Sequence, residues 1–284
     1  MRLKITHIIS VATLMLFAAC KKDNPIGPTS TTDLSVKLLH ISHTRDSIYT
    51  SFIYGVDHID FSKYEVLMLG GDMLYDSSLD QVEMDLMENT FNISSPNTLW
   101  SIGNHDDTSP WMISSYTGRT LHYAYHNNGI TYVVLDSELD DCNIINSQLT
   151  LFNNVVDTIQ ESSHLIVLTH KLIWMYGNNN LEPLVPEISN GQLGNNSWNI
   201  FPNNFYNDLY WKLLDLQNAG IQVICIGGDI GINSAVFEHR FDSGIQFLAS
   251  GVYYNNVQSK KALVFEHTKS KGLLTWEYVN IEDL

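Results

Sequence analysis

Gly103-Asn104-His105-Asp106 is the most informative stretch of this 284-residue sequence. This polar turn follows a short apolar run that ends at Ile102. Comparable turns end three other apolar runs: Gly70-Gly71-Asp72 after 66–69, Thr169-His170 after 165–168, and Gly227-Gly228-Asp229 after 223–226. Open α/β sheets place their ligands just past the carboxyl ends of the strands. The spacing therefore predicts one metal-centred site that is assembled from distant segments.

Apolar runs of strand length alternate with amphipathic segments along the chain, which predicts the α/β class. Strands are expected at 36–41, 66–69, 98–102, 165–168 and 221–226, and a hairpin at 122–135 that turns at Asn127-Asn128-Gly129. Helices are expected at 147–161 and 205–219. The last strands, at 245–249, 262–266 and 273–278, should make the sheet partly antiparallel.

Two segments without a clear period are unusually long for loops. They cover residues 107–120 and 176–204, and each leaves directly from a turn with candidate ligands. Loops of this length inside a compact domain are often functional. We therefore expect both to cover the predicted site.

The composition restricts the kinds of partner that the protein surface can bind. The net charge of −16 disfavours a basic surface for nucleic acid or anionic lipid, and it is explained by solubility alone. A hydrophobic content of 44% supports a sizeable core. Cys225 lies inside an apolar run, so Cys142 and Cys225 are expected to be buried thiols rather than a disulfide.

The amino-terminal segment has the pattern of a bacterial lipoprotein signal. A basic start precedes an apolar run and the stretch Leu16-Phe17-Ala18-Ala19-Cys20. We expect a signal peptide at 1–19, a lipid on Cys20, a flexible tether at 20–35 and one domain at 36–284. An ordinary secretory signal or a membrane anchor stays an alternative. The expected location is the outer membrane or cell surface, with the periplasmic face left open.

The order Asp72, Asn104-His105, His170 and Asp229 resembles the calcineurin-like metallophosphoesterases. Their pattern is D-x-H, then G-D, then G-N-H-D/E, then a single His, then G-H-x-H. The resemblance runs from about Val36 to the end of the chain. It implies an α/β sandwich of two facing mixed sheets flanked by helices. It also implies metal-dependent hydrolysis of a phosphate ester, either a small molecule or a polymer.

The resemblance assigns ligands for two metal ions in the family. One set becomes Asp72, Asn104, His170 and Asp229 in this chain, and all four side chains can ligate a divalent ion such as manganese, zinc or iron. The other set becomes His43, Arg45, Asp72 and Gly231. Arg45 cannot ligate and Gly231 has no side chain, so this second site is weakened.

Three interpretations stay open for the altered centre. The chain is a mononuclear enzyme in which Arg45 replaces the charge of the second metal, because a guanidinium matches phosphate oxygens. Alternatively, it holds two metals, with His43 and waters completing a loose site. In the third interpretation catalysis is lost, and the lipoprotein binds a glycan or a phosphorylated ligand. A Ser/His/Asp hydrolase ranks low because no G-x-S-x-G elbow is present.

The resemblance also suggests roles in catalysis. A metal-activated water would attack phosphorus, and His105 would protonate the leaving oxygen as a general acid. Asp106 or Asp76 is the hypothetical partner that orients the His105 ring. Tyr75 matches an iron-binding tyrosine of purple acid phosphatases in position, but with the neighbouring site weakened we expect it in the core or at the rim.

Overall fold

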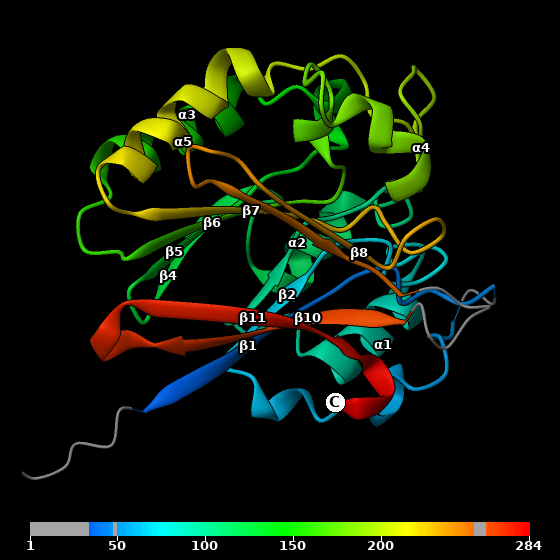
Figure 1. Ribbon diagram of the computed structural model, residues 1–284. Coiled ribbons are helices and arrows are strands. Elements are labelled where there is room, and N and C mark those ends of the chain that lie inside the picture. Colours follow the sequence, from blue (N-terminus) through cyan, green and yellow to red (C-terminus); the bar gives the residue numbers. More distant parts are fainter. Residues whose placement is uncertain (1–33, 48–49, 253–259) are drawn as a thin grey trace, which may run out of the picture. The chain divides into compact units, whose positions relative to one another are not determined.

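The computed structural model describes residues 34–47, 50–252 and 260–284. All of them belong to one compact unit, Asp33–Leu284. The predicted signal peptide and Cys20 lie outside the described residues. Two mixed sheets form the centre of this unit (Figure 1). In the described part of the chain, no helix is long and apolar enough to cross a membrane.

The five-stranded sheet has the order β11-β10-β1-β2-β3. Strands β1, β2 and β3 run parallel, and β10 pairs antiparallel with both β1 and β11. Its strands are β1 (Ser35–Ile41), β2 (Val66–Leu69), β3 (Thr98–Trp100), β10 (Lys261–Thr268) and β11 (Leu273–Asn280).

The six-stranded sheet has the order β4-β5-β6-β7-β9-β8. Strands β5, β6, β7 and β9 are parallel, whereas β4 and β8 are antiparallel edge strands. Its strands are β4 (Tyr123–Asn127), β5 (Ile130–Val134), β6 (His164–Thr169), β7 (Gln222–Gly227), β8 (Val236–Arg240) and β9 (Gln246–Ser250). The α/β class with two mixed sheets flanked by helices is thus confirmed.

Helices cover the outer faces of both sheets, as Figure 1 shows for α3 and α5 above the six-stranded sheet. The α-helices are α1 (Gln81–Phe91), α2 (Pro110–Thr117), α3 (Asn146–Thr158), α4 (Val185–Ile188) and α5 (Tyr210–Asn218), the last preceded by the π-helical turn η6 (Phe205–Leu209). Short 3-10 helices are η1 (Val56–His58), η2 (Phe61–Lys63), η3 (Leu139–Cys142), η4 (Ile173–Met175), η5 (Glu182–Leu184), η8 (Lys269–Lys271) and η9 (Ile281–Asp283).

The alternation of side chains along each strand produces three buried layers. On β2, Met68 packs between the sheets, and Leu67 and Leu69 pack beneath α1 and α2. On β6, Ile166 and Leu168 face the other sheet, whereas Leu165 and Val167 pack under α3 and α5. Because the central strands are buried on both faces, β2 contains only apolar residues and could be predicted from the sequence.

The structure departs from the expected elements in four places, one of which is the short helix α4 within the segment 176–204 that was expected to be a loop. Helix α2 lies within the segment 107–120 that was expected to be a loop, and the helix α1 was not predicted. Strand β8 was also missed, because among its residues only Phe237 is buried and the edge position requires no apolar alternation. Elsewhere the expected strands and helices are present within a few residues, including the hairpin of β4 and β5.

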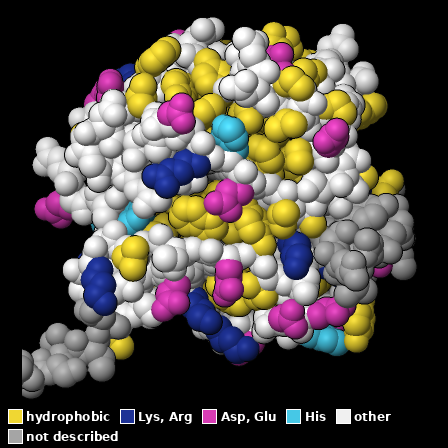
Figure 2. Space-filling model, viewed as in Figure 1, with side chains coloured by type: hydrophobic (Ala, Val, Ile, Leu, Met, Phe, Trp, Pro, Cys, Tyr) yellow, Lys and Arg dark blue, Asp and Glu magenta, His cyan; other side chains and the backbone are white. Residues whose placement is uncertain are grey.

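On the face that Figure 2 shows, acidic and basic side chains are interspersed with apolar and uncharged ones. Cys142 and Cys225 are buried free thiols, as predicted. Burial raises the pKa of the Cys142 thiol to about 11, so this group is not ionised near neutral pH.

Candidate metal centre

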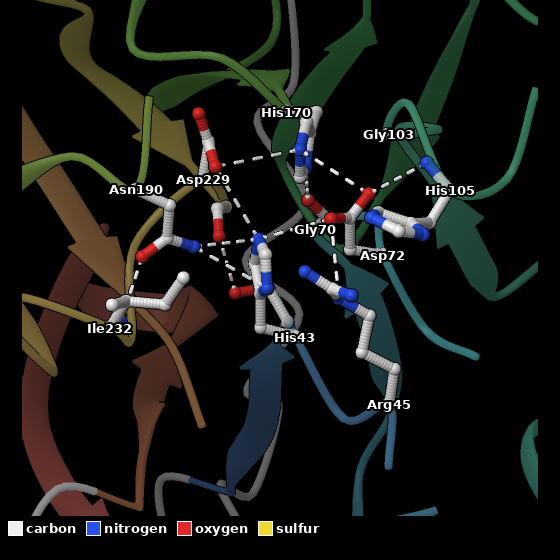
Figure 3. Close-up of polar contacts among 12 residues, drawn as sticks. His43, Arg45, Gly70, Asp72, Gly103, His105, His170, Asn190, Asp229 and Ile232 are labelled. Carbon is white, nitrogen blue, oxygen red and sulfur yellow. Dashed lines mark hydrogen bonds and ion pairs between the residues drawn. The ribbon is translucent and has the colours of Figure 1, made fainter. Parts of the chain in front are cut away.

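Four of the five predicted ligands, His43, Asp72, His170 and Asp229, meet at the carboxyl ends of strands from both sheets (Figure 3). His43 and Arg45 follow β1, and Asp72 follows β2 in the five-stranded sheet. His170 follows β6, and Asp229 follows β7 in the six-stranded sheet. Each parallel strand delivers its turn to the same edge, so residues far apart in sequence become neighbours.

The centre of the site is a buried group of two imidazoles and two carboxylates. His43 Nε2 lies 3.4 Å from Asp72 Oδ2 and 3.4 Å from Asp229 Oδ1. His170 Nε2 lies 3.5 Å from Asp72 Oδ1 and 3.9 Å from Asp229 Oδ1. One ligand atom from each of His43, His170 and Asp229 lies within 4.8 Å of the others, which suits a single metal ion.

His170 shows most directly that the group fits a metal. Its Nδ1 lies 2.7 Å from the carbonyl oxygen of Gly70, which can only accept a hydrogen bond, so Nδ1 carries the hydrogen. The Nε2 atom is fully buried and has no hydrogen-bond partner among the described residues. A backbone carbonyl that fixes the tautomer of an imidazole is the usual support for a metal-ligating histidine.

The electrostatics of the group favour a cation between the two carboxylates. Burial opposes ionisation of Asp72, but His170, His43 and Arg45 hold its pKa well below its usual value. Burial also disfavours a charge on His170, yet Asp72 and Asp229 outweigh it and raise the pKa of that imidazole. Positive charge is therefore stabilised where the ligand atoms converge.

The backbone at the site is held in unusual conformations. His43 and Asp72 have φ angles of 53° and 55°, in the left-handed region, and Gly71 between the strand and Asp72 has a φ of 90°. Gly103 is required for space, because a Cβ there would lie 2.3 Å from Asp72 Oδ1. Such strain tends to concentrate at functional sites.

The resemblance assigns Arg45 and Gly231 to its weakened second metal site. Arg45 Nε lies 3.6 Å from Asp72 Oδ2, so a guanidinium stands beside the carboxylate. Gly231, with a φ of 131°, contributes no side chain there. Arg45, His43 and Tyr75 are among the residues that line a cavity of about 230 Å³.

His105 is anchored at the edge of this group. Its backbone N–H donates to Asp72 Oδ1 at 3.0 Å, and its ring Nδ1 lies 2.6 Å from the carbonyl oxygen of Tyr75. The ring of Tyr75 also makes an edge contact with the imidazole. Asn104, the preceding residue, is partly buried, and its ligand role stays a prediction.

The hypothesis that Asp106 or Asp76 orients the His105 ring is wrong, because the Tyr75 carbonyl does so. The fully buried Asp106 carboxylate accepts hydrogen bonds from five donors: the backbone N–H groups of Asp72, Met73 and Gly103, the Ser77 hydroxyl and the Trp100 indole. Asp106 therefore holds the Asp72 turn against the Gly103 turn.

Asn190, which the loop 176–204 brings next to His43, had no individual signal in the sequence. Its Nδ2 lies 2.9 Å from His43 Nε2, while its Oδ1 accepts from the Ile232 backbone N–H at 2.7 Å. The neighbouring Ser189 hydroxyl lies 3.4 Å from Asp229 Oδ2. The expectation that this loop covers the site holds, but the loop contains many asparagines, so nothing distinguished Asn190.

The sequence matches no family model and no curated protein. Similar solved structures include a dimetal phosphatase from Danio rerio, with 11% identity over 87% of this chain and 99% of that chain and a TM-score of 0.49. Another is a phosphoesterase from E. coli, with 12% identity, 86% and 99% coverage and a TM-score of 0.37. A third is Vps29 from Entamoeba histolytica complexed with zinc, with 10% identity, 86% and 99% coverage and a TM-score of 0.35.

Proposed function

We propose that this chain hydrolyses phosphate esters at one divalent metal ion held by Asp72, His170 and Asp229. The observation that carries the proposal is the buried His170 Nε2, which has no hydrogen-bond partner among the described residues and lies near both carboxylates. His43 and Asn104 are the further candidate ligands. The metal would lower the pKa of a water and polarise a phosphoryl oxygen.

Arg45 supplies a positive charge beside Asp72 Oδ2, the oxygen that His43 also approaches. Its guanidinium is partly exposed and borders the same cavity as His43, so a phosphate that enters this cavity meets it. Guanidinium groups bind phosphate oxygens in a bidentate way. Arg45 would therefore orient the phosphate and stabilise the charge that develops on it.

His105 would transfer a proton to the leaving oxygen. The Tyr75 carbonyl fixes the hydrogen on Nδ1 and leaves Nε2 as the atom that exchanges a proton with substrate. The backbone bond from His105 to Asp72 keeps the ring next to the candidate metal centre. A positioned acid of this kind contributes roughly 10²–10⁴-fold to a rate.

A second candidate function is binding without turnover. Arg45 and Gly231 remove two metal ligands that the resemblance requires, and this change favours a lipoprotein that only captures a phosphorylated ligand or a glycan. The two candidates differ in one measurement. The purified chain is loaded with manganese, zinc or iron, and its metal content and turnover of an aryl phosphate are determined.

Metal binding with turnover supports the enzyme, and metal binding without turnover supports the capture function. A chain that binds none of the three metals at neutral pH would overturn the metal-dependent hydrolase. Arg45→Lys serves as the matched variant, because it keeps the charge and loses the bidentate geometry. It should reduce turnover and leave the metal content unchanged.

We also propose that the chain is anchored to the bacterial envelope through a lipid on Cys20. Support comes from the sequence pattern before Cys20, which lies outside the described residues. The full chain with Cys20→Ser, expressed in a bacterial host, should lose incorporation of radioactive palmitate and leave the membrane fraction. Unchanged labelling would show that Cys20 is not the lipidated residue.

A further inference from the structure

The cavity that borders the candidate metal centre at His43 and Arg45 also has an apolar part. Three further lining residues are aliphatic: Ile53, Ile232 and Val252. Ile53 and Val252 are 3% and 2% exposed, whereas Ile232 is 48% exposed. A half-uncovered aliphatic side chain beside a charged site is stabilised by contact with an apolar ligand. The cavity therefore joins charged groups to an aliphatic surface.

Backbone hydrogen bonds hold the three aliphatic residues in place against the segments that carry the site. The bonds run from the Ile53 N–H to the Thr44 carbonyl at 2.7 Å, from the Ile232 N–H to Asn190 Oδ1 at 2.7 Å and from the Val252 N–H to the Ser42 carbonyl at 3.1 Å. Figure 3 shows Ile232 next to Asn190 and His43. The aliphatic surface is therefore formed before a ligand binds, which lowers the cost of ordering it.

Arg45 has donors left for an anion in this cavity. A guanidinium carries five N–H donors. The Arg45 side chain is 24% exposed, and its contact with Asp72, 3.6 Å from Nε to Oδ2, is longer than a hydrogen bond. Asp46 lines the same cavity, but its Oδ1 accepts from the Ser47 N–H at 2.6 Å and from the Ser47 hydroxyl at 3.2 Å. The cavity therefore suits a molecule with one anionic group and an apolar remainder.

Tyr75 connects the cavity to His105. It lines the cavity, and its ring makes an edge contact with the His105 imidazole, with 5.5 Å between the ring centroids. Its carbonyl oxygen lies 2.6 Å from His105 Nδ1. A group that fills the cavity therefore lies near the proposed acid, which is the place for the alcohol that leaves phosphorus.

We propose that this cavity binds the alcohol part of the substrate and selects an apolar one. The inference rests on the proposed function, because the phosphate of the same molecule would lie between Arg45 and the candidate metal centre. An apolar cavity of roughly 150 Å³ already accommodates benzene. This cavity, of about 230 Å³, has room for one aromatic ring or a short alkyl chain. The substrate class is therefore a phosphate ester of an aryl or short alkyl alcohol.

Non-hydrolysable phosphonates test the cavity separately from turnover. Calorimetry on the metal-loaded full chain compares butylphosphonate and phenylphosphonate with 3-hydroxypropylphosphonate, which matches the butyl compound in length but ends in a hydroxyl group. Turnover of an aryl phosphate is recorded in parallel. We expect the two apolar compounds to bind at least about tenfold more tightly than the hydroxyl compound, since an apolar pocket discriminates by this factor when one methyl group is lost.

Ile232→Asn places a polar side chain in the cavity and keeps the backbone N–H that bonds Asn190. This variant should reduce the preference for the apolar compounds by about threefold or more, because part of the aliphatic surface is lost. Leu273→Asn is the matched control, since Leu273 is 49% exposed and lies on β11, outside the cavity lining. It should keep the full preference.

The outcomes separate the cavity from the hydrolase. Equal affinities of the three phosphonates, or binding of none, overturn the cavity assignment. An unchanged preference in Ile232→Asn, or an equal loss in Leu273→Asn, overturns it as well. Turnover of the aryl phosphate with equal phosphonate affinities leaves the hydrolase and removes only the selection of an apolar alcohol. An apolar preference without turnover supports the cavity and overturns only the hydrolase.

Discussion

His43 Nε2 lies 3.4 Å from Asp229 Oδ1, although His43 follows a strand of one sheet and Asp229 follows a strand of the other. The candidate metal centre therefore lies at the junction between the two sheets. The sheets approach closely there, because a Cβ on Gly228 would lie 1.8 Å from the carbonyl oxygen of Gly70. Each sheet contributes one carboxylate and one imidazole, so the relative position of the sheets determines metal affinity.

Metal content tests this shared centre. The purified chain should retain about one divalent ion after dialysis, and Asp229→Ala should weaken binding by at least about tenfold, because a charged ligand is lost. Mass spectrometry of the metal measures both. Asp157→Asn, an exposed carboxylate on α3, is the control and should bind as the parent does. Unchanged binding in Asp229→Ala would remove Asp229 from the ligand set.

His105 is expected to act on turnover rather than on metal binding. His105→Ala should lower kcat for an aryl phosphate by about 10²–10⁴-fold, since the leaving oxygen loses its proton donor. Metal content should stay the same, because the backbone N–H that bonds Asp72 is kept. If metal affinity and kcat fall together, His105 is a structural residue of the site and not an acid.

Asp106 is expected to act on stability. Asp106→Asn keeps the shape of the side chain but places an N–H₂ group against the donors that the carboxylate accepts. We expect a loss on the order of 2–3 kcal/mol in the free energy of unfolding. The metal affinity should fall as well, because the Asp72 turn loses its support. Denaturant unfolding measures the loss of stability. If the variant is as stable as the parent but loses turnover, Asp106 instead takes part in the catalysed reaction.

Gly228 is expected to tolerate no side chain. Gly228→Ala would force the Gly70 and Gly228 turns apart, since the new Cβ overlaps backbone rather than a movable side chain. Both the thermal midpoint and metal binding should decrease. Gly118→Ala is the control for the cost of placing an alanine at a left-handed glycine. Nothing lies within 4 Å of a Cβ there, so only its φ of 66° is unfavourable. Similar midpoints for the two variants would contradict the close approach of the sheets.

Buried histidines away from the centre predict sensitivity to acid. Burial lowers the pKa of His164 from 6.5 to about 4. Above pH 6.5 the imidazole is neutral in both states, but between pH 6.5 and 4 the unfolded chain takes up a proton that the folded chain does not. Stability should therefore fall as the pH decreases through this window, by on the order of 2 kcal/mol from this group.

His164→Gln tests the acid sensitivity, because it keeps a polar side chain that cannot be protonated. The variant should show a smaller decrease of the unfolding free energy between pH 6.5 and 4 than the parent chain. Chemical denaturation at several pH values gives this slope. An identical slope in the variant would show that other groups account for the acid sensitivity.

The fold was predictable wherever local periodicity carries the information. The buried strand Val66–Leu69 and the hairpin of β4 and β5 appear as expected. Helix α1 was missed although its sequence holds a signal: Asp80 caps it, and Met84, Met87 and Phe91 are buried at helical spacing. Strand β8 has no such signal in its own residues. It is a strand because its backbone pairs with β9.

The sequence by itself determined the residue types at the strand ends, and hence Asp72, His170 and Asp229 as members of one site. Only the tertiary structure decided that Asn190 contacts His43, that Tyr75 orients His105 and that Asp106 braces the Asp72 turn. The reason is physical. Strand position follows from local hydrophobic pattern, whereas a hydrogen bond across many residues depends on where two separate loops are packed.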